Sequence, residues 1–198
     1  MKEITVKGEA RTALGKKACR DLRRQGGVPC VLYGVERDEN NAPVAKTFTV
    51  SQKELAKVLY TPNVYIVNLD IDGVVVKAIL KDLQCDFVKD TPVHVDFYQI
   101  TEEHPIVMDI PVKLNGLAEG VKAGGKLVLQ MRKLKVRALY NVIPERLIIN
   151  VAHLGLGKTV KVGELQYEGL ELLNAKEAVV CAVKLTRAAR GAAAAAGN

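Results

Sequence analysis

The sequence predicts a mainly β protein of two domains, with helices confined to its first half. Its 198 residues are enough for one large or two ordinary domains. Short runs of alternating apolar and polar residues, typical of half-buried strands, recur along the chain, whereas apolar residues at helical spacing occur in two stretches. With 48% hydrophobic and 26% charged residues, the composition is that of a folded protein and excludes a disordered or collagen-like chain.

The first elements follow from these patterns. An alternating run predicts a strand at 3–8, and a helix is predicted over 16–25, where apolar residues share one face and two glycines follow. Strands are expected at 28–33 and 44–50. Pro29 lacks a backbone N–H, so it indicates an edge strand or a first strand position.

The rest of the first half contains a second helix and a hairpin. Ser51 is followed three residues later by a glutamate, a capping-box pattern that predicts a helix start. Strands at 64–70 and 74–80 flank Asp72-Gly73, the dipeptide that most favours a tight hairpin turn. A further strand is expected at 93–100.

The second half reads as strands and loops. We expect strands at 106–114, 134–139, 147–151 and 178–185. The glycines of 120–125 are expected to form a turn that needs positive φ. We place the domain boundary near 100–104, which gives domains at 1–100 and 101–186, and we expect the Ala-rich tail, 187–198, to be disordered.

Composition excludes several classes of protein. No stretch reaches the roughly 18 apolar residues of a membrane span, and the N-terminus lacks the apolar core of a secretory signal. The four cysteines, which are Cys19, Cys30, Cys85 and Cys181, form no C-x-x-C pair. We therefore expect a cytoplasmic protein with reduced thiols, and neither a metal nor a cofactor nor a membrane partner.

Basic residues are concentrated in two regions. The chain carries a net charge of +7, which favours polyanionic partners. Six basic residues lie within 11–24 beside one acid, Asp21, and six more lie within 122–137, where there is no acid. The first cluster is either a solvated helix face or a surface whose guanidinium groups contact phosphates. For the second, whose exposed strand face carries Lys133, Lys135 and Arg137, the sequence does not distinguish binding from solubility.

Three further motifs each have a plainer interpretation. Residues 155–159 resemble the end of a phosphate-binding P-loop, but position 152 is Ala, and the segment that follows is strand-like where the motif requires a helix. Residues 120–125 do not connect a strand to a helix, as a dinucleotide-binding loop must. His94 and Asp96 project from one strand face, and no nucleophile or ligand spacing accompanies them. A surface polar pair is favoured, and such a pair can also contact RNA.

These segments have a familiar order. Residues 11–23, 28–34 and 94–97 resemble the bacterial large-subunit ribosomal protein L-twenty-five family, also called the general stress protein CTC family. Residues 120–127 and 141–144 resemble the C-terminal domain of its longer, two-domain form, and the likeness extends from about residue 3 to about residue 185. It implies an N-terminal β-barrel with helices and a second, β-roll-like domain.

The resemblance also implies a function without catalysis. The N-terminal domain of the family binds 5S rRNA at an internal loop rich in non-Watson–Crick pairs. The second domain is expected to contact neighbouring large-subunit components, and no small-molecule substrate is implied. Carried over by position, the RNA contacts are Arg11, Lys16, Arg20, Arg23, Tyr33, His94 and Asp96. Asp21, Asp86 and Asp90 stand where family members often carry more positive charge, and the tail lacks the acidic residues of longer members.

Two other functions compete with this interpretation. The barrel also resembles the anticodon-binding part of glutaminyl-tRNA synthetase, which makes tRNA a conceivable ligand. A protein-interaction or stress module acting away from the ribosome is the rival from another class. An enzyme ranks third, because no constellation of converging polar residues is visible.

Overall fold

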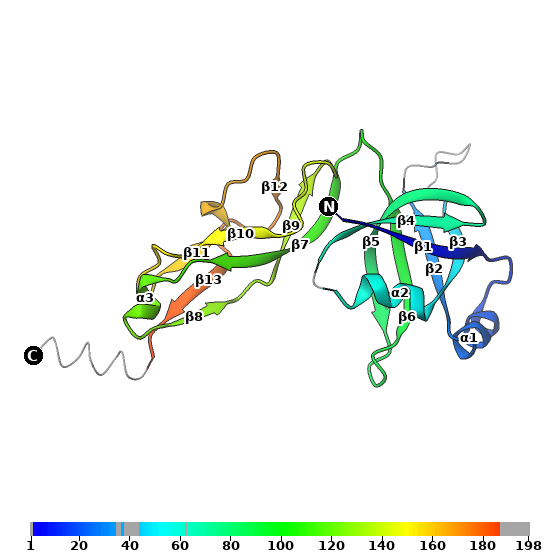
Figure 1. Cartoon of the computed structure of the whole chain (residues 1–198), viewed down its shortest axis with the longest axis horizontal. Helices are drawn as coiled ribbons and strands as arrows, with labels where there is room; N and C mark the ends of the chain where they lie inside the picture. Colours follow the sequence, from blue (N-terminus) through cyan, green and yellow to red (C-terminus); the bar gives the residue numbers. More distant parts are fainter. Residues whose placement is uncertain (1, 35–36, 38–43, 62, 187–198) are drawn as a thin grey trace, which may run out of the picture. The chain divides into compact units, whose positions relative to one another are not determined.

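Two compact units make up the protein (Figure 1). The computed structural model describes residues 2–34, 37, 44–61 and 63–186. The first unit comprises the chain up to Ile106 together with Leu139–Asn141, and the second comprises Val107–Ala138 and the chain from Val142 onward. The predicted tail, 187–198, lies outside the described residues. Within the described ranges, no helix is both long enough and apolar enough to cross a bilayer.

A closed six-stranded barrel forms the first unit, in the order β1-β3-β2-β6-β5-β4, with β1 pairing β4. The β1–β4 and β2–β6 pairs are parallel and the others are antiparallel. Inward-facing residues fill the barrel, and the rings of Phe48 and Phe97 lie 5.8 Å apart at its centre. The strands are β1 (Lys2–Ala10), β2 (Gly27–Tyr33), β3 (Lys46–Ser51), β4 (Tyr65–Ile71), β5 (Val74–Cys85) and β6 (Pro92–Gln99).

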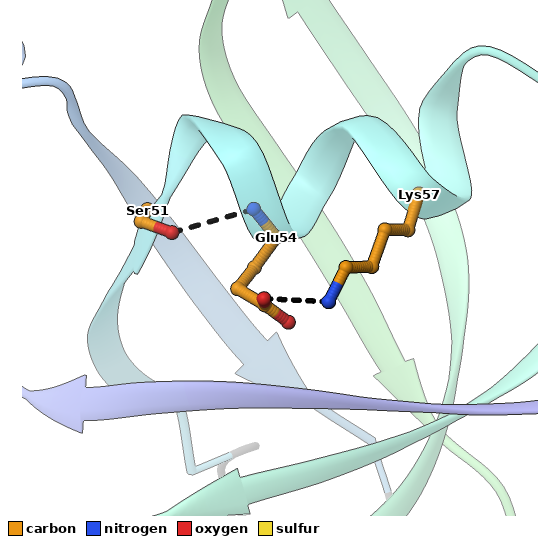
Figure 2. Close-up of polar contacts among 3 residues, drawn as sticks. All are labelled: Ser51, Glu54 and Lys57. Carbon is orange, nitrogen blue, oxygen red and sulfur yellow. Dashed lines mark hydrogen bonds and ion pairs between the residues drawn. The ribbon is translucent and has the colours of Figure 1, made fainter.

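Two helices accompany the barrel, α1 (Lys16–Arg24) and α2 (Gln52–Leu59), as the sequence predicts. Figure 2 shows how α2 begins: the Ser51 hydroxyl accepts a hydrogen bond from the Glu54 N–H at 3.3 Å. The reciprocal half of the expected capping box is replaced by an ion pair, because the Glu54 carboxylate accepts from Lys57 Nζ at 2.6 Å. Leu55 and Val58 are buried in the barrel core, which anchors this helix.

The predicted hairpin joins β4 and β5. Asp72 and Gly73 both have positive φ, 50° and 87°, which is the backbone that a two-residue turn between twisted strands requires. The Asp70 carboxylate accepts the Gly73 N–H at 3.1 Å and fixes the turn. β5 continues past the predicted end at residue 80, because a register shift between Leu80 and Asp82 lets it keep pairing with β6.

The expectation that Pro29 marks an edge strand or a first strand position is wrong. β2 pairs β3 on one side and β6 on the other. Pro29 is its third residue, and the ladder to β6 begins only at the next residue, Cys30. The proline is therefore tolerated because it precedes the second ladder.

The second unit contains two small sheets, with strand orders β10-β7-β9-β12 and β11-β13-β8. The four predicted strands are present as β7, β9, β10 and β13, and the mainly β class is confirmed in both units. A short α-helix, a 3-10 turn and three strands were not expected, so the expectation that helices are confined to the first half is wrong. The elements are β7 (Ile106–Asn115), α3 (Glu119–Lys122), β8 (Lys126–Leu129), β9 (Lys133–Ala138), β10 (Leu147–Asn150), β11 (Thr159–Lys161), η1 (Val162–Glu164), β12 (Glu171–Leu172) and β13 (Val179–Lys184).

Close packing, more than positive φ, explains the glycines of 120–125. Of these only Gly124 has positive φ, at 85°. A Cβ on Gly120 would lie 2.6 Å from the carbonyl carbon of Gly155, and one on Gly125 would lie 2.6 Å from the Gly120 carbonyl oxygen. The expected turn is therefore only part of the explanation, since two backbone segments meet here without room for a side chain.

Candidate nucleic-acid interface

Helix α1 is fastened to the barrel where β2 and β6 begin. Arg23 Nε donates a hydrogen bond to the Val93 carbonyl at 3.0 Å. Leu22 packs so closely over Gly27 that a Cβ there would lie 3.0 Å from its Cγ. These contacts bring the basic helix next to the strand that carries His94 and Asp96, 70 residues further along the chain.

The basic side chains of α1 face solvent. None of the nine residues of this helix is fully buried, and Lys16 is exposed at its start. Arg20 Nε and Arg24 Nη1 lie 3.8 Å and 3.9 Å from the Asp21 carboxylate, with the arginine side chains 62% and 70% exposed. Exposed pairs at this distance stabilise a helix only weakly, so both guanidinium groups are available to a polyanion.

A row of polar and aromatic residues runs along the outer face of β6. His94, Asp96 and Tyr98 alternate with the buried Val95 and Phe97. His94 Nδ1 lies 2.7 Å from Asp96 Oδ1, and each side chain is about one-third exposed, at 28% and 30%. The prediction that these two residues share a face is confirmed. With Nδ1 turned to the carboxylate, Nε2 is the imidazole nitrogen available to a partner.

Tyr33 extends this row onto β2. It pairs in register with Tyr98, and the two rings meet edge to face with centroids 5.9 Å apart. Burial, followed by the carboxylates of Asp96 and Asp82, raises the pKa of the Tyr33 phenol. The hydroxyl therefore stays a neutral hydrogen-bond donor at physiological pH.

Arg11 is partly buried beside the start of α1. Its backbone N–H donates to the Thr47 carbonyl at 3.1 Å, and Nη1 lies 3.5 Å from the Cys19 sulfur. Its Nε is buried, and no described residue accepts a hydrogen bond from it. Arg11 thus contacts Cys19 near the start of α1, so it stabilises the position of the helix in addition to supplying positive charge.

A groove of about 460 Å³ separates α1 from the loop between β5 and β6. Arg20, Arg23 and Arg24 line one side, and Asp86 and Lys89 line the other. Asp86 accepts hydrogen bonds from two backbone N–H groups of its own loop, which lower the pKa of its carboxyl group and keep it ionised.

Three residues outside the predicted contact set belong to this surface: Arg24, Lys89 and Tyr98. Arg24 belongs to the predicted basic cluster, and the alternation that singled out His94 and Asp96 also points to Tyr98. Lys89 has no such signal, because only the loop geometry brings it to the arginines.

The second basic region forms an exposed strand face in the second unit. Lys133, Lys135 and Arg137 of β9 are exposed, while the alternating Leu134, Val136 and Ala138 are buried, as expected from the sequence. Arg137 pairs in register with Glu171 of β12. Three exposed cations on one strand face favour a polyanion or an acidic protein as partner.

The described residues do not support a nucleotide-binding loop or a metal site. Residues 155–159 lead into β11 rather than a helix, so they lack the helix N-terminus that a P-loop uses to hold phosphates. Among the described residues, no group of three or more histidine, cysteine or acidic side chains is arranged to hold a metal ion.

Both units match families of ribosomal proteins. Residues 6–97 match the ribosomal L25p family, and residues 105–187 match the C-terminal domain of ribosomal protein TL5. The chain is 68% identical over 198 residues to the large ribosomal subunit protein bL25 of Phocaeicola vulgatus, with all of both chains covered. It is 66% identical over 203 residues to the protein of that name from Bacteroides fragilis, again over all of both chains. The one from Porphyromonas gingivalis is 53% identical over 194 residues and 98% of each chain.

Members of this family are structural proteins of the large ribosomal subunit, which act in translation at the cytoplasmic ribosome and are not enzymes. The resemblance drawn from the sequence is confirmed on both halves of the chain, and the enzyme interpretation falls away. With a matching model over most of each unit and full-length relatives above 60% identity, the chain belongs to the ribosomal L25p family.

Proposed function

We propose that this chain binds 5S rRNA, at an internal loop of non-Watson–Crick pairs, through α1 and the outer faces of β2 and β6. The observation that carries the proposal is the hydrogen bond from Arg23 to the Val93 carbonyl, which holds a basic helix beside the strand of His94 and Asp96. The proposed contacts are Arg11, Lys16, Arg20, Arg23, Tyr33, His94 and Asp96.

The two parts of this surface suit different parts of an RNA. Exposed cations of α1, such as Lys16 and Arg20, are positioned to contact phosphates, which fix register without reading sequence. An A-form duplex hides its major groove, so recognition uses the minor groove, 2′-hydroxyls and distorted pairs. The second oxygen of Asp96 suits base amino groups, and the Tyr33 hydroxyl and His94 Nε2 suit 2′-hydroxyls.

The second unit is assigned a different partner. We take 1–100 as the RNA-binding domain and 101–186 as a domain that contacts neighbouring components of the large subunit. The exposed cations of β9 support this assignment. They lie on a sheet that is separate from the barrel, and the residues that alternate with them are buried. Lys133 and Lys135 are the residues through which we expect that contact.

The test is binding of the full chain to 5S rRNA in excess tRNA across a salt series, with Arg20→Ala and His94→Ala as variants. Tight binding that survives tRNA is expected, with affinity falling steeply as salt rises because neutralised phosphates release counterions. Each substitution should weaken binding about 5- to 50-fold, as loss of a charge-assisted or base contact does. The double variant Lys133→Gln/Lys135→Gln should leave 5S rRNA affinity within about two-fold and weaken retention on intact large subunits.

Several results would contradict this proposal. Binding abolished by tRNA would favour a general polyanion or tRNA module, and a chain that sediments free of large subunits would favour a role away from the ribosome. If Arg20→Ala and His94→Ala both left the affinity unchanged, the assigned surface would be wrong.

A further inference from the structure

The loop between β5 and β6 exposes two large apolar side chains at its tip. Phe87 is 106% exposed and Val88 is 92% exposed, so the phenylalanine ring makes almost no contact with the rest of the described chain. Figure 1 shows this loop extending beyond the barrel wall below β6. Exposed apolar residues are common singly, but adjacent, fully exposed ones on a projecting loop are typical of a contact surface.

Hydrogen bonds hold this loop in one shape. The Asp86 carboxylate accepts the N–H groups of Val88 and Lys89 at 2.9 Å and 3.0 Å, and the Asp90 N–H donates to the Asp86 carbonyl at 2.9 Å. The Tyr60 hydroxyl donates to the Asp90 carbonyl at 3.2 Å and ties the loop to the end of α2. Phe87 is therefore presented by a fixed turn, and a partner that covers it need not order the loop first.

The charges around the tip favour RNA as the partner. The residues on either side of the apolar pair, Asp86 and Lys89, line the same groove as Arg20, Arg23 and Arg24. The loop carries two acids, Asp86 and Asp90, whereas Lys89 and the three arginines give the groove at its base four cations. An apolar ring beside several cations suits a nucleobase flanked by phosphates, since every base has a face on which an aromatic ring can stack.

We propose that Phe87 stacks on an unpaired or splayed nucleobase of the bound RNA, next to the phosphates held by α1. The inference rests on the proposed RNA binding and adds to it a stacking contact on the β5–β6 loop. Internal loops supply such bases, because their non-Watson–Crick pairs unstack at lower cost than a regular duplex.

The chain contains no tryptophan, so Phe87→Trp introduces its only tryptophan, a fluorophore distinct from the six tyrosines, at the proposed contact. We expect this variant to bind 5S rRNA as tightly as the parent, with its emission quenched by the stacked base. Phe87→Ala should bind about 5- to 160-fold more weakly, the range for loss of one base–aromatic stack. Because no charge is lost, its plot of log affinity against log salt should run parallel to that of the parent protein.

The matched control is Val75→Ala, which truncates a side chain 63% exposed beside the β4–β5 turn. It should leave RNA affinity within about two-fold, and thermal melts should show that both alanine variants remain folded. If the parent protein failed to bind 5S rRNA, the proposed function and this inference would both fall. If the parent bound while Phe87→Ala bound equally well, or while Phe87→Trp emission did not change, only the stacking contact would be refuted.

Discussion

Replacing Asp21 by Asn is expected to tighten RNA binding. Asp21 is the only acid within the basic cluster at 11–24, and its carboxylate lies within 4 Å of both Arg20 and Arg24. Asparagine keeps the size and hydrogen-bonding capacity of the side chain and removes its charge. Arg20 and Arg24 then no longer pair with a carboxylate, so both guanidinium groups can pair with RNA phosphates.

The geometry sets the size of the gain. At 3.8 Å and 3.9 Å, each pair is worth about 1 kcal/mol in bulk water, and water is the appropriate medium because the side chains are 45% to 70% exposed. Screening at physiological salt and the entropy of holding two long side chains reduce this to about 0.2–1 kcal/mol per pair. The sum for two pairs, about 0.4–2 kcal/mol, corresponds to roughly a 2- to 30-fold increase in affinity.

The assay is titration of labelled 5S rRNA at three salt concentrations. The gain should shrink as salt rises, because a Debye length of about 10 Å at 0.1 M falls to about 3 Å at 1 M. Glu3→Gln is the control, since Glu3 pairs with Lys77 at 3.8 Å and has similar exposure, 49%. Glu3 lies on β1, which is three strands from β6 in either direction around the barrel. Its substitution should change affinity by less than about two-fold.

Weaker binding by Asp21→Asn would refute this reasoning. It would mean that the carboxylate orients the guanidinium groups for the RNA instead of competing with it. An equal gain from Glu3→Gln would refute it too, since the effect would then come from net charge and not from the α1 surface.

Two further predictions concern the packing and the thiols. Gly120→Ala should lower the melting temperature of the second unit by at least about 4 °C, because overpacking costs about 1–3 kcal/mol where a Cβ would lie 2.6 Å from a backbone carbon. Gly155→Ala, whose Cβ would meet the Lys158 side chain at 3.8 Å, is the calorimetric control, and equal melts would contradict the packing account. Iodoacetamide near pH 8 should label Cys19 and Cys85 and spare Cys30, because burial raises the pKa of the Cys30 thiol from 9.0 to about 12. Since the unfolded thiol ionises near its ordinary pKa, burial of Cys30 also makes the free energy of unfolding fall as pH rises from about 9 towards 12. Mass spectrometry that showed equal labelling of Cys30 and Cys19 in the native protein would contradict the raised pKa of Cys30.

Local patterns predicted the elements that local chemistry determines. The Asp72-Gly73 turn, the start of α2 at Ser51 and the shared face of His94 and Asp96 each depend on neighbours within four residues. Elements that depend on distant partners were missed or misjudged. α3 and β8 lie in a glycine-rich segment with little periodicity, and β8 is a strand because β13, some 50 residues away, pairs with it.

The candidate site divides in the same way. Its basic residues could be read from the sequence, whereas their geometry could not. The sequence does not reveal that Arg11 turns to Cys19, that Arg23 bonds to Val93, or that Lys89 faces the arginines. Arg23 and Val93 are 70 residues apart and meet only because the barrel places β6 beside β2.

The two helices of the barrel differ in a way that bears on function. α2 has a serine cap, an acid in its first turn, a lysine in its last turn and two residues in the core, so it satisfies the local rules of helix stability. α1 has no side-chain cap, begins with Lys16 and Lys17 where the helix dipole disfavours cations, and has no fully buried residue of its own. Natural proteins break such rules mainly where function requires it. A phosphate at the start of α1 would satisfy its N–H groups and offset both lysines, so the features that weaken this helix in the free protein are those that a bound RNA would stabilise.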